Sequence, residues 1–182
     1  MNWLARFFSA LVLLSLMALG LAALYLRAPV PEPALPRPTL PLTGPVERIV
    51  VDKAARRLSL IQNGAVVRVY TVALGLQPRG GKLRQGDGRT PEGTFRINRR
   101  NAASAYHLSL GLDYPQPADI ARARAGGYDP GGDIMIHGQP NALPETVKVP
   151  GDWTAGCVAL TNAEMREIWA VAPTGTPVEV RP

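Results

Sequence analysis

The stretch Ile134-Met-Ile-His-Gly138, followed after a loop by Asp152-Trp-Thr-Ala-Gly-Cys-Val-Ala-Leu-Thr-Asn162, organises the rest of the chain. The first segment is a short apolar run typical of a buried strand, and it ends on a histidine. The second places the only cysteine of the chain directly behind a glycine, which permits a tight turn. A neighbouring imidazole can take the proton of a thiol and so activate it as a nucleophile. We therefore predict that His137 and Cys157 meet in space as a catalytic pair.

The residues around the pair predict the supporting parts of such a site. Backbone N–H groups in the turn at Gly156 can hold the oxygen that becomes negative when a thiolate attacks an amide carbonyl. We expect Thr154 to hydrogen-bond this turn or the substrate, and Gly138 to let the chain leave its strand at an unusual angle. Trp153 is either a core aromatic or one wall of the cleft. A histidinium partner would let Cys157 ionise at a lower pH than a free cysteine.

A purely structural interpretation remains open for each residue of the pair. A lone histidine is often a hydrogen-bonded core residue, and a free cysteine is often buried and inert. We favour the reactive pair because the Gly-Cys turn and the strand-ending histidine occur together, and we assign His107 a structural role. One cysteine and two histidines lack the short spacing of zinc ligands, so we expect neither a metal nor an organic cofactor.

Strand patterns dominate the domain around these residues. An Asn63-Gly64 pair between the apolar runs 57–61 and 65–74 predicts a hairpin, with its β-branched second arm in a sheet interior. Further strands are predicted at 46–52, 95–97, 107–112, 134–136 and 177–180. Helices are few: one is predicted over 117–125, and another begins near Asn162 behind a Thr161–Glu164 capping box. The pattern predicts a mostly-β, curved or sandwich-like domain with one or two short packed helices.

The N-terminal region predicts a tether. Residues 7–26 form about 20 positions without a charge, a length that spans one bilayer. We favour an uncleaved signal anchor over a cleaved signal peptide for residues 1–27. Seven prolines in 28–45 predict a stiff extended spacer, so the folded domain occupies 46–182.

The charge distribution argues against a nucleic-acid partner. The chain has a formal net charge of +6, but its arginines are scattered and form no continuous stripe. Such a solvated basic surface suits an anionic polymer such as a cell wall.

The combined motifs resemble a known family. Ile136-His-Gly138 and Thr154-Ala-Gly-Cys-Val158 look like the signature of the L,D-transpeptidase catalytic domain, also called the YkuD domain. The upstream segment Thr90-Pro-Glu-Gly-Thr-Phe95 is similar to that family's Thr-Pro-x-Gly-x-Phe segment. The resemblance extends from about residue 46 to the end, and it implies a mainly β, YkuD-like curved β-sandwich.

The resemblance also implies peptidoglycan chemistry in the bacterial cell envelope, at the periplasmic face of the inner membrane or in the periplasm, with a role in wall organisation and cell shape. The family's cysteine attacks stem peptides after meso-diaminopimelate, releases D-alanine and passes the acyl group to an amine, which forms 3-3 cross-links. Carried over to this sequence, Cys157 is the nucleophile and His137 the proton donor and acceptor, while Thr154 and Gly156 complete the turn.

Two departures from the commonest family pattern leave the acceptor open. Ala155 stands where many members have histidine, and Ala159 stands where many have arginine. The motif looks like a branch that includes an enzyme detaching a lipoprotein from peptidoglycan, so a wall-anchored lipoprotein is a candidate partner. With water as acceptor the protein would be a hydrolase, and a third alternative is a non-catalytic wall-binding module.

Overall fold

The computed structural model describes Trp3, Leu42 and residues 44–182. The predicted membrane anchor and most of the predicted spacer lie outside these residues. Within the part of the chain that is described, no helix is long and apolar enough to cross a membrane. Residues 44–182 belong to one compact unit, which contains the whole of the domain predicted from residue 46 onward.

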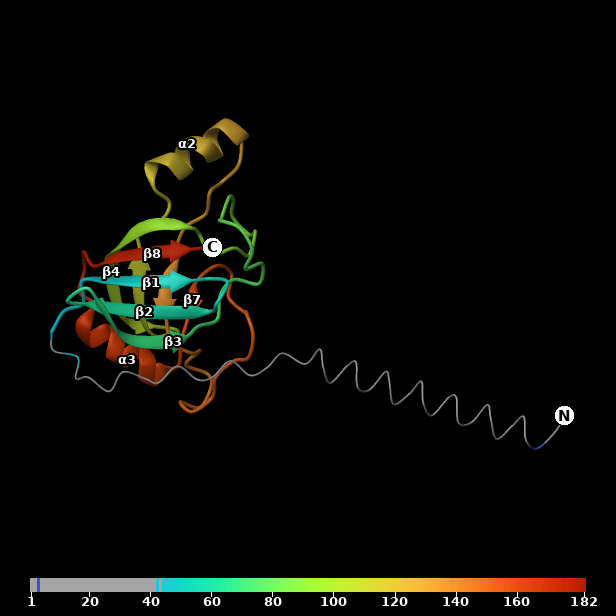
Figure 1. The fold of residues 1–182 in the computed structure, drawn as a ribbon. Coiled ribbons are helices and arrows are strands. Elements are labelled where there is room, and N and C mark those ends of the chain that lie inside the picture. The colour runs from blue at the N-terminus through green and yellow to red at the C-terminus, as the bar shows by residue number, and fades with distance from the viewer. Residues whose placement is uncertain (1–2, 4–41, 43) are drawn as a thin grey trace. The chain divides into compact units, whose positions relative to one another are not determined.

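A curled eight-stranded sheet forms the body of this unit (Figure 1). The strands run in the order β3-β2-β1-β8-β4-β5-β6-β7. Neighbours are antiparallel except for the parallel pairs β1–β8 and β6–β7. The strand bounds are β1 Arg48–Asp52, β2 Arg57–Gln62, β3 Ala65–Thr71, β4 Gly93–Ser104, β5 His107–Leu112, β6 Met135–His137, β7 Val158–Ala159 and β8 Pro177–Arg181.

The long strand β4 takes part in both halves of the curled sheet. Its first residues pair with β8, whereas its later residues pair with β5, and the register shifts between Ile97 and Arg99. At the far side the backbones of Ala73 and Ala159 exchange two hydrogen bonds of 2.9 and 2.8 Å, so the segment after β3 meets β7. The predicted mainly-β, curved architecture is therefore confirmed. The predicted β-sandwich is not, because the described strands form one curled sheet and not two stacked sheets.

The hairpin β2–β3 forms where it was predicted, but its second arm lies elsewhere in the sheet than expected. Asn63 and Gly64 have φ values of 52° and 71°, the positive values that a type I′ turn requires. The strand β3, however, is the first in the sheet order and has only β2 beside it, so the expected place in the sheet interior is wrong. β-branched residues suit a pleated surface in general, so they do not reveal how many neighbours a strand has.

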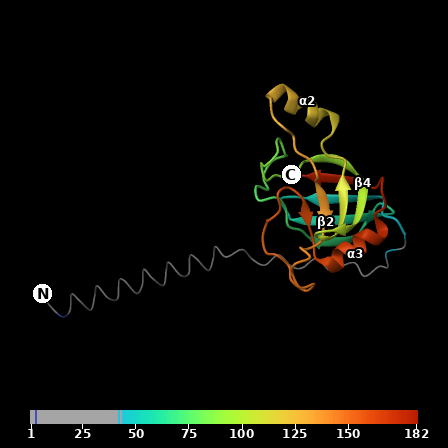
Figure 2. The ribbon, with the colours of Figure 1, turned by 180° about the vertical axis from the view of Figure 1, so that it is seen from behind.

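Two helices, α2 (Pro117–Gly126) and α3 (Asn162–Val171), accompany the sheet in residues 44–182. Figure 2 shows α3 beside the sheet and α2 standing apart from it. The α3 capping box is present, since Thr161 Oγ1 accepts from the Glu164 N–H at 3.3 Å and Glu164 Oε2 accepts from the Thr161 N–H. Met165 and Ile168 are fully buried in the core. Because α3 follows β7 almost directly, its packing anchors the short strand that begins directly after the cysteine.

Candidate active site

The two residues predicted to react come from adjacent parallel strands. His137 is the last residue of β6, and Cys157 directly precedes β7. In the β6–β7 pair, Ile136 lies opposite Val158 and His137 lies opposite Ala159. The strand register therefore places the cysteine beside the start of β6 and the histidine beside the end of β7.

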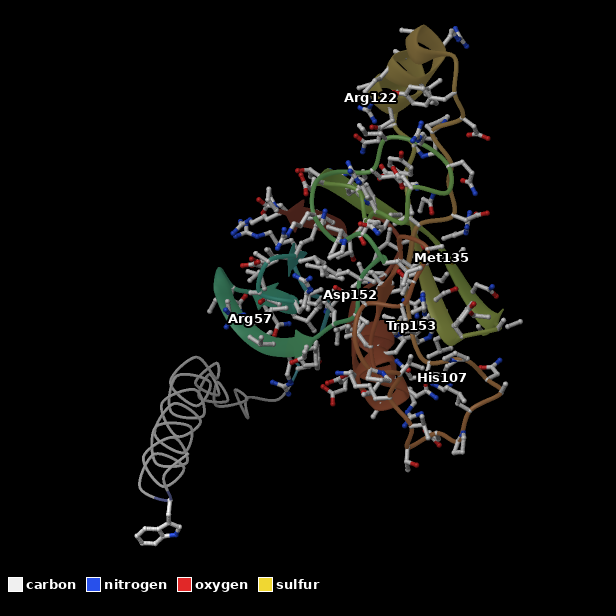
Figure 3. The ribbon with its side chains drawn as sticks, turned by 90° about the vertical axis from the view of Figure 1, so that its right-hand side faces the viewer. Arg57, His107, Arg122, Met135, Asp152 and Trp153 are labelled. Atoms are coloured by element: carbon white, nitrogen blue, oxygen red, sulfur yellow. The ribbon has the colours of Figure 1, made fainter. Side chains whose placement is uncertain are left out.

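Both side chains open on one cleft of about 570 Å³. Met135 and Trp153, which Figure 3 labels, also line it, whereas Arg122 lies away from it on α2. Of the predicted site residues, the structure brings His137, Cys157, Thr154 and Trp153 to this cleft, whereas Gly138 and Gly156 are not among the residues that line it. The complete lining consists of Asn101, Ser104, Ala105, Tyr106, Ser109, Asp133, Met135, His137, Trp153, Thr154, Ala155 and Cys157.

A backbone hydrogen bond fixes the tautomer of His137. Its Nδ1 lies 2.7 Å from the carbonyl oxygen of Gly138. A carbonyl only accepts hydrogen bonds, so Nδ1 must carry the proton in the neutral ring. The other nitrogen, Nε2, is then unprotonated and has the lone pair that a general base needs.

Aromatic rings enclose the imidazole. The Tyr106 ring lies 4.7 Å from the His137 ring between centroids, and the Trp153 ring lies 5.7 Å away at its edge. Only 4% of His137 is exposed. This burial lowers the pKa of His137, and the hydrogen bond with Gly138 opposes the shift. The ring is therefore neutral at neutral pH and available as a base.

The cysteine rests as a thiol. Its Sγ–H donates to the carbonyl oxygen of Asp133 at 3.5 Å, and no hydrogen bond among the described residues joins Sγ to His137. Burial raises the pKa of Cys157, and a hydrogen bond with the backbone of Met135 opposes that rise. The expectation that Cys157 ionises at lower pH than a free cysteine is therefore wrong for the resting protein. No histidinium is present to stabilise the thiolate, because His137 is itself kept neutral.

The predicted turn is held by a threonine side chain. Thr154 Oγ1 donates to the carbonyl of Cys157 at 2.8 Å and accepts from the Gly156 N–H at 3.1 Å. The Gly156 N–H is thus already engaged and does not point at a substrate. No hydrogen bond among the described residues uses the N–H of Ala155 or Cys157, so these two groups remain as candidate oxyanion donors.

Glycine is required at position 156 for two reasons. Its φ of 145° is a conformation that other residues rarely adopt. A Cβ at this position would also lie 2.7 Å from the carbonyl oxygen of Arg89. The turn is therefore packed closely against the loop that precedes β4.

That loop, residues 75–93, includes the Thr-Pro-Glu-Gly segment noted in the sequence and is fixed by a buried lysine. Lys53 Nζ donates to the carbonyls of Gly80 and Thr90 at 2.7 and 3.0 Å and to Glu92 Oε1 at 2.7 Å. Thr90 Oγ1 in turn accepts from the Gly75 N–H at 3.2 Å. The Thr90–Gly93 segment thus supports the cysteine turn from behind and does not line the cleft.

The cleft residues that sequence reasoning missed include Tyr106, Ser109 and Asp133. Ser109 lies opposite His137 in the β5–β6 pair, and its buried hydroxyl has no hydrogen-bond partner. Among the described residues, the only other buried side-chain nitrogen or oxygen without a partner is Trp153 Nε1, which belongs to the same cleft. Unpaired buried polar groups are rare, so these two groups are available to water or to a polar ligand in the cleft. No group of His, Cys, Asp or Glu suited to a metal ion occurs within the described residues.

Comparisons with known proteins identify the family of the chain. Residues 46–180 match the L,D-transpeptidase catalytic domain (YkuD) family model. No curated protein matches the chain.

Several solved structures share the fold. The helical cell shape determining protein Pgp2 from Campylobacter jejuni is 24% identical, with a TM-score of 0.57, over 75% of this chain and 47% of that chain. The L,D-transpeptidase from Xylanimonas cellulosilytica is 19% identical, with a TM-score of 0.52, over 78% of this chain and 63% of that chain. The chain thus spans about half the length of the Pgp2 structure, and identities this low show a common fold alone.

Proposed function

Because the chain belongs to the L,D-transpeptidase catalytic domain family, we propose that it is a cysteine-dependent acyltransferase acting on peptidoglycan stem peptides in the bacterial cell envelope. The observation that carries the proposal is the shared cleft of Cys157, the only thiol, and His137, whose Nε2 is free to accept a proton. The substrate is a stem peptide with meso-diaminopimelate at its third position and a terminal D-alanine.

Acylation begins when the Sγ–H proton passes to His137 Nε2. The sulfur then attacks the carbonyl carbon of diaminopimelate, and the carbonyl oxygen becomes negative. We infer that the N–H groups of Ala155 and Cys157 stabilise this oxygen, because no hydrogen bond among the described residues uses them. The imidazolium returns its proton to the nitrogen of D-alanine as the peptide bond breaks, which leaves a thioester on Cys157.

Deacylation repeats these proton transfers in the opposite direction. An acceptor amine gives a proton to His137 Nε2 and attacks the thioester carbon. The carbon–sulfur bond breaks and the sulfur regains its proton, so the thiol is restored. If the amine belongs to a second diaminopimelate residue, the product is a 3-3 cross-link. If water attacks instead, the product is a tripeptide and the enzyme is a hydrolase. A wall-linked lipoprotein would be released in the preceding acylation, if its amine took the place of D-alanine as the leaving group.

The cellular setting of the proposal includes a tether. The uncharged run at 7–26 and the proline-rich segment at 28–45 suit a domain held near the periplasmic face of the inner membrane, or one released into the periplasm. The domain would then meet the wall as its substrate.

The test is incubation of the full-length protein with disaccharide tetrapeptide, followed by mass spectrometry of the products. We expect release of D-alanine and the appearance of 3-3 linked dimers, with a thioester of matching mass trapped on Cys157. A Cys157→Ala variant should form neither product nor adduct.

The distribution of products decides between the remaining alternatives. Tripeptide in place of dimer, even with added amine, would identify a hydrolase. Unchanged turnover in Cys157→Ala would overturn the proposed mechanism. Binding to sacculi without any turnover, together with a thiol inert to iodoacetamide in the folded protein, would identify a wall-binding module.

A further inference from the structure

One lining residue gives the cleft its only formal charge. With His137 neutral, Asp133 is the single charged residue among those that line the cleft. Its carbonyl oxygen accepts the Sγ–H of Cys157, so the carboxylate belongs to the residue that contacts the nucleophile. The side chain is 82% exposed and points away from the core. A group bound to this carboxylate would therefore contact a residue that itself contacts the sulfur of Cys157.

The Asp133 carboxylate has a partner that reaches it across a neighbouring strand. Arg99 Nη2 lies 2.6 Å from Asp133 Oδ1. Arg99 is on β4, opposite Gly111 of β5, and Gly111 lies opposite Met135 of β6. A Cβ on residue 111 would lie 2.6 Å from Arg99 Cγ and 3.0 Å from its Nε. Glycine at 111 therefore lets the arginine stem lie across β5 and bring its guanidinium to the carboxylate of Asp133.

A charged ligand could replace either partner of this ion pair. Both side chains are substantially exposed, 47% for Arg99 and 82% for Asp133, and exposed ion pairs gain little because water competes with each partner. A ligand with only an ammonium would bind Asp133 and leave Arg99 unpaired. A ligand with an ammonium and a carboxylate on one carbon would replace one ion pair by two, and arginine can hold a carboxylate through two parallel hydrogen bonds.

We propose that Asp133 and Arg99 together bind a zwitterionic amino-acid group of the substrate, with its ammonium on Asp133 and its carboxylate on Arg99. Under the proposed function, this group is the free end of the diaminopimelate side chain. Asp133 and Arg99 then select diaminopimelate over lysine, which carries the ammonium but not the carboxylate. The identity of the substrate rests on the proposed function, whereas the binding of a zwitterion at this pair does not.

Protection of the thiol tests binding without any turnover. Full-length protein is alkylated with iodoacetamide, a neutral reagent, in the presence of meso-diaminopimelate, cadaverine or pimelate. Cadaverine lacks carboxylates and pimelate lacks ammonium groups. We expect only diaminopimelate to slow alkylation of Cys157, and both Asp133→Asn and Arg99→Gln to abolish that protection. Asp133 raises and Arg99 lowers the pKa of Cys157, so protection is compared as a rate ratio within each variant.

Turnover tests selectivity with two tetrapeptides that carry diaminopimelate or lysine at the third position. We expect Arg99→Gln to raise the KM for the diaminopimelate peptide about fivefold, with kcat changed less, and to leave the lysine peptide unaffected. Asp133→Asn should weaken both peptides, and Arg99→Lys should restore part of the preference. Gly111→Ala should mimic Arg99→Gln by displacing the arginine. Arg181→Gln breaks another exposed ion pair, with Glu179 on β8 outside the cleft, and serves as the matched control.

The two proposals fail in distinguishable ways. Diaminopimelate protection that depends on Asp133 and Arg99, without turnover of either peptide, would support the zwitterion site and refute the transpeptidase function. Turnover with unchanged KM and unchanged selectivity in both variants, or protection by cadaverine equal to that by diaminopimelate, would overturn the zwitterion site. A change in KM or selectivity of the same size in Arg181→Gln would also overturn the zwitterion site. It would show that loss of any surface arginine, and not of Arg99 in particular, changes substrate binding.

Discussion

His137 and Cys157 each lie in surroundings that favour the uncharged side chain. Burial lowers the pKa of the imidazole and raises the pKa of the thiol, so both shifts disfavour a thiolate–histidinium ion pair. A stable thiolate–histidinium pair at rest would require the reverse of both shifts. The resting protein therefore holds a neutral acceptor and a neutral donor, and proton transfer must accompany attack on the substrate.

This arrangement predicts the pH dependence of thiol alkylation. We expect the rate of Cys157 alkylation by iodoacetamide to rise with a midpoint above the value of about 8.5 of a free cysteine, because burial disfavours the thiolate. His137→Gln should leave that midpoint nearly unchanged, since a neutral imidazole adds no charge. Mass spectrometry of the alkylated fraction against pH measures both. A midpoint below that of free cysteine, lost in His137→Gln, would instead show a resting ion pair.

The second prediction for a single residue concerns the effect of Gly156→Ala on activity and stability. Gly156→Ala should lower kcat/KM by about 100-fold, because its φ of 145° and the 2.7 Å approach to Arg89 O force the turn to move, and small displacements of reacting atoms are costly. Its free energy of unfolding should fall by only about 1–3 kcal/mol. Steady-state kinetics and urea unfolding separate the two effects.

Gly151→Ala is the matched control for Gly156→Ala. Gly151 also has a positive φ, 69°, but a Cβ there meets nothing within 4 Å. This variant should lose about 1 kcal/mol of stability and keep its activity. Equal losses of activity in both variants would mean that backbone strain alone, and not displacement of the cysteine turn, explains the result.

Sequence alone predicted that His137 and Cys157 would share a cleft, but it did not predict the directions of their pKa shifts. His137 ends a recognisable strand and Cys157 follows a glycine, so both could be named, and their catalytic roles stay predictions. Asp133 and Arg99 are 34 positions apart, and they meet only because β4, β5 and β6 adopt a particular register. The pKa directions depend on burial by Tyr106 and Trp153, which no local pattern encodes.

At the level of elements, the loop 75–93 is a rigid support and not an open connection. Three acceptors converge on the ammonium of Lys53, which is 2% exposed. Buried lysines are rare, so a lysine in the sequence predicts a surface position by default. The Thr-Pro-Glu-Gly segment could be recognised from the sequence, but its role behind the cysteine turn depends on this distant lysine.

Lys53→Met should therefore lower both stability and turnover. We expect the free energy of unfolding to fall by about 3 kcal/mol, because Glu92 and two carbonyl groups lose their partner in a buried setting. We expect kcat/KM to fall as the loop releases the Gly156 turn. Urea unfolding and steady-state kinetics measure the two effects.

Lys148→Met provides the comparison. Lys148 is exposed and donates only to the carbonyl of Thr71 at 3.2 Å, so its loss should change stability by less than about 0.5 kcal/mol. Full activity in Lys53→Met would show that the loop does not position the cysteine turn.

The position of β3 shows that composition can predict a strand without predicting its place in the sheet. The run Val66-Val-Arg-Val-Tyr70 has a strong β propensity, and it does form a strand. Its place at the start of the sheet order follows from the topology, because β8 and not β3 lies on the other side of β1. Which strands become neighbours depends on contacts between distant segments, so the hairpin could be predicted and its location could not.

At the scale of the whole molecule, the two backbone hydrogen bonds between Ala73 and Ala159 join the ends of the curled sheet. The two-residue strand β7 is thereby held on both sides, by β6 and by the segment after β3. A two-residue strand is held mainly by its neighbours. The position of the cysteine that precedes β7 therefore depends on the Ala73–Ala159 pair that closes the sheet.

Ala73→Pro tests this closure, since proline cannot donate the hydrogen bond to Ala159 O. We expect the free energy of unfolding to fall by about 1–3 kcal/mol. The amide of Ala159 donates the remaining bond, to the carbonyl of residue 73, and it should exchange faster because the closure is weakened. Ala73→Ser keeps the donor and should retain protection. If Ala159 stayed protected in the proline variant, the closure would not be what holds β7.

The sheet order has a further consequence for how the domain folds during its synthesis. The strand that joins the β3-β2-β1 side to the β4–β7 side is β8, and it is the last strand of the domain in the chain. On a ribosome, both sides would emerge and wait without their common neighbour until residues 177–181 had left the exit tunnel. Nascent chains must therefore remain incomplete, with two unpaired edges, until synthesis of the domain ends. A stop codon only a few positions early would leave two half-sheets with nothing between them.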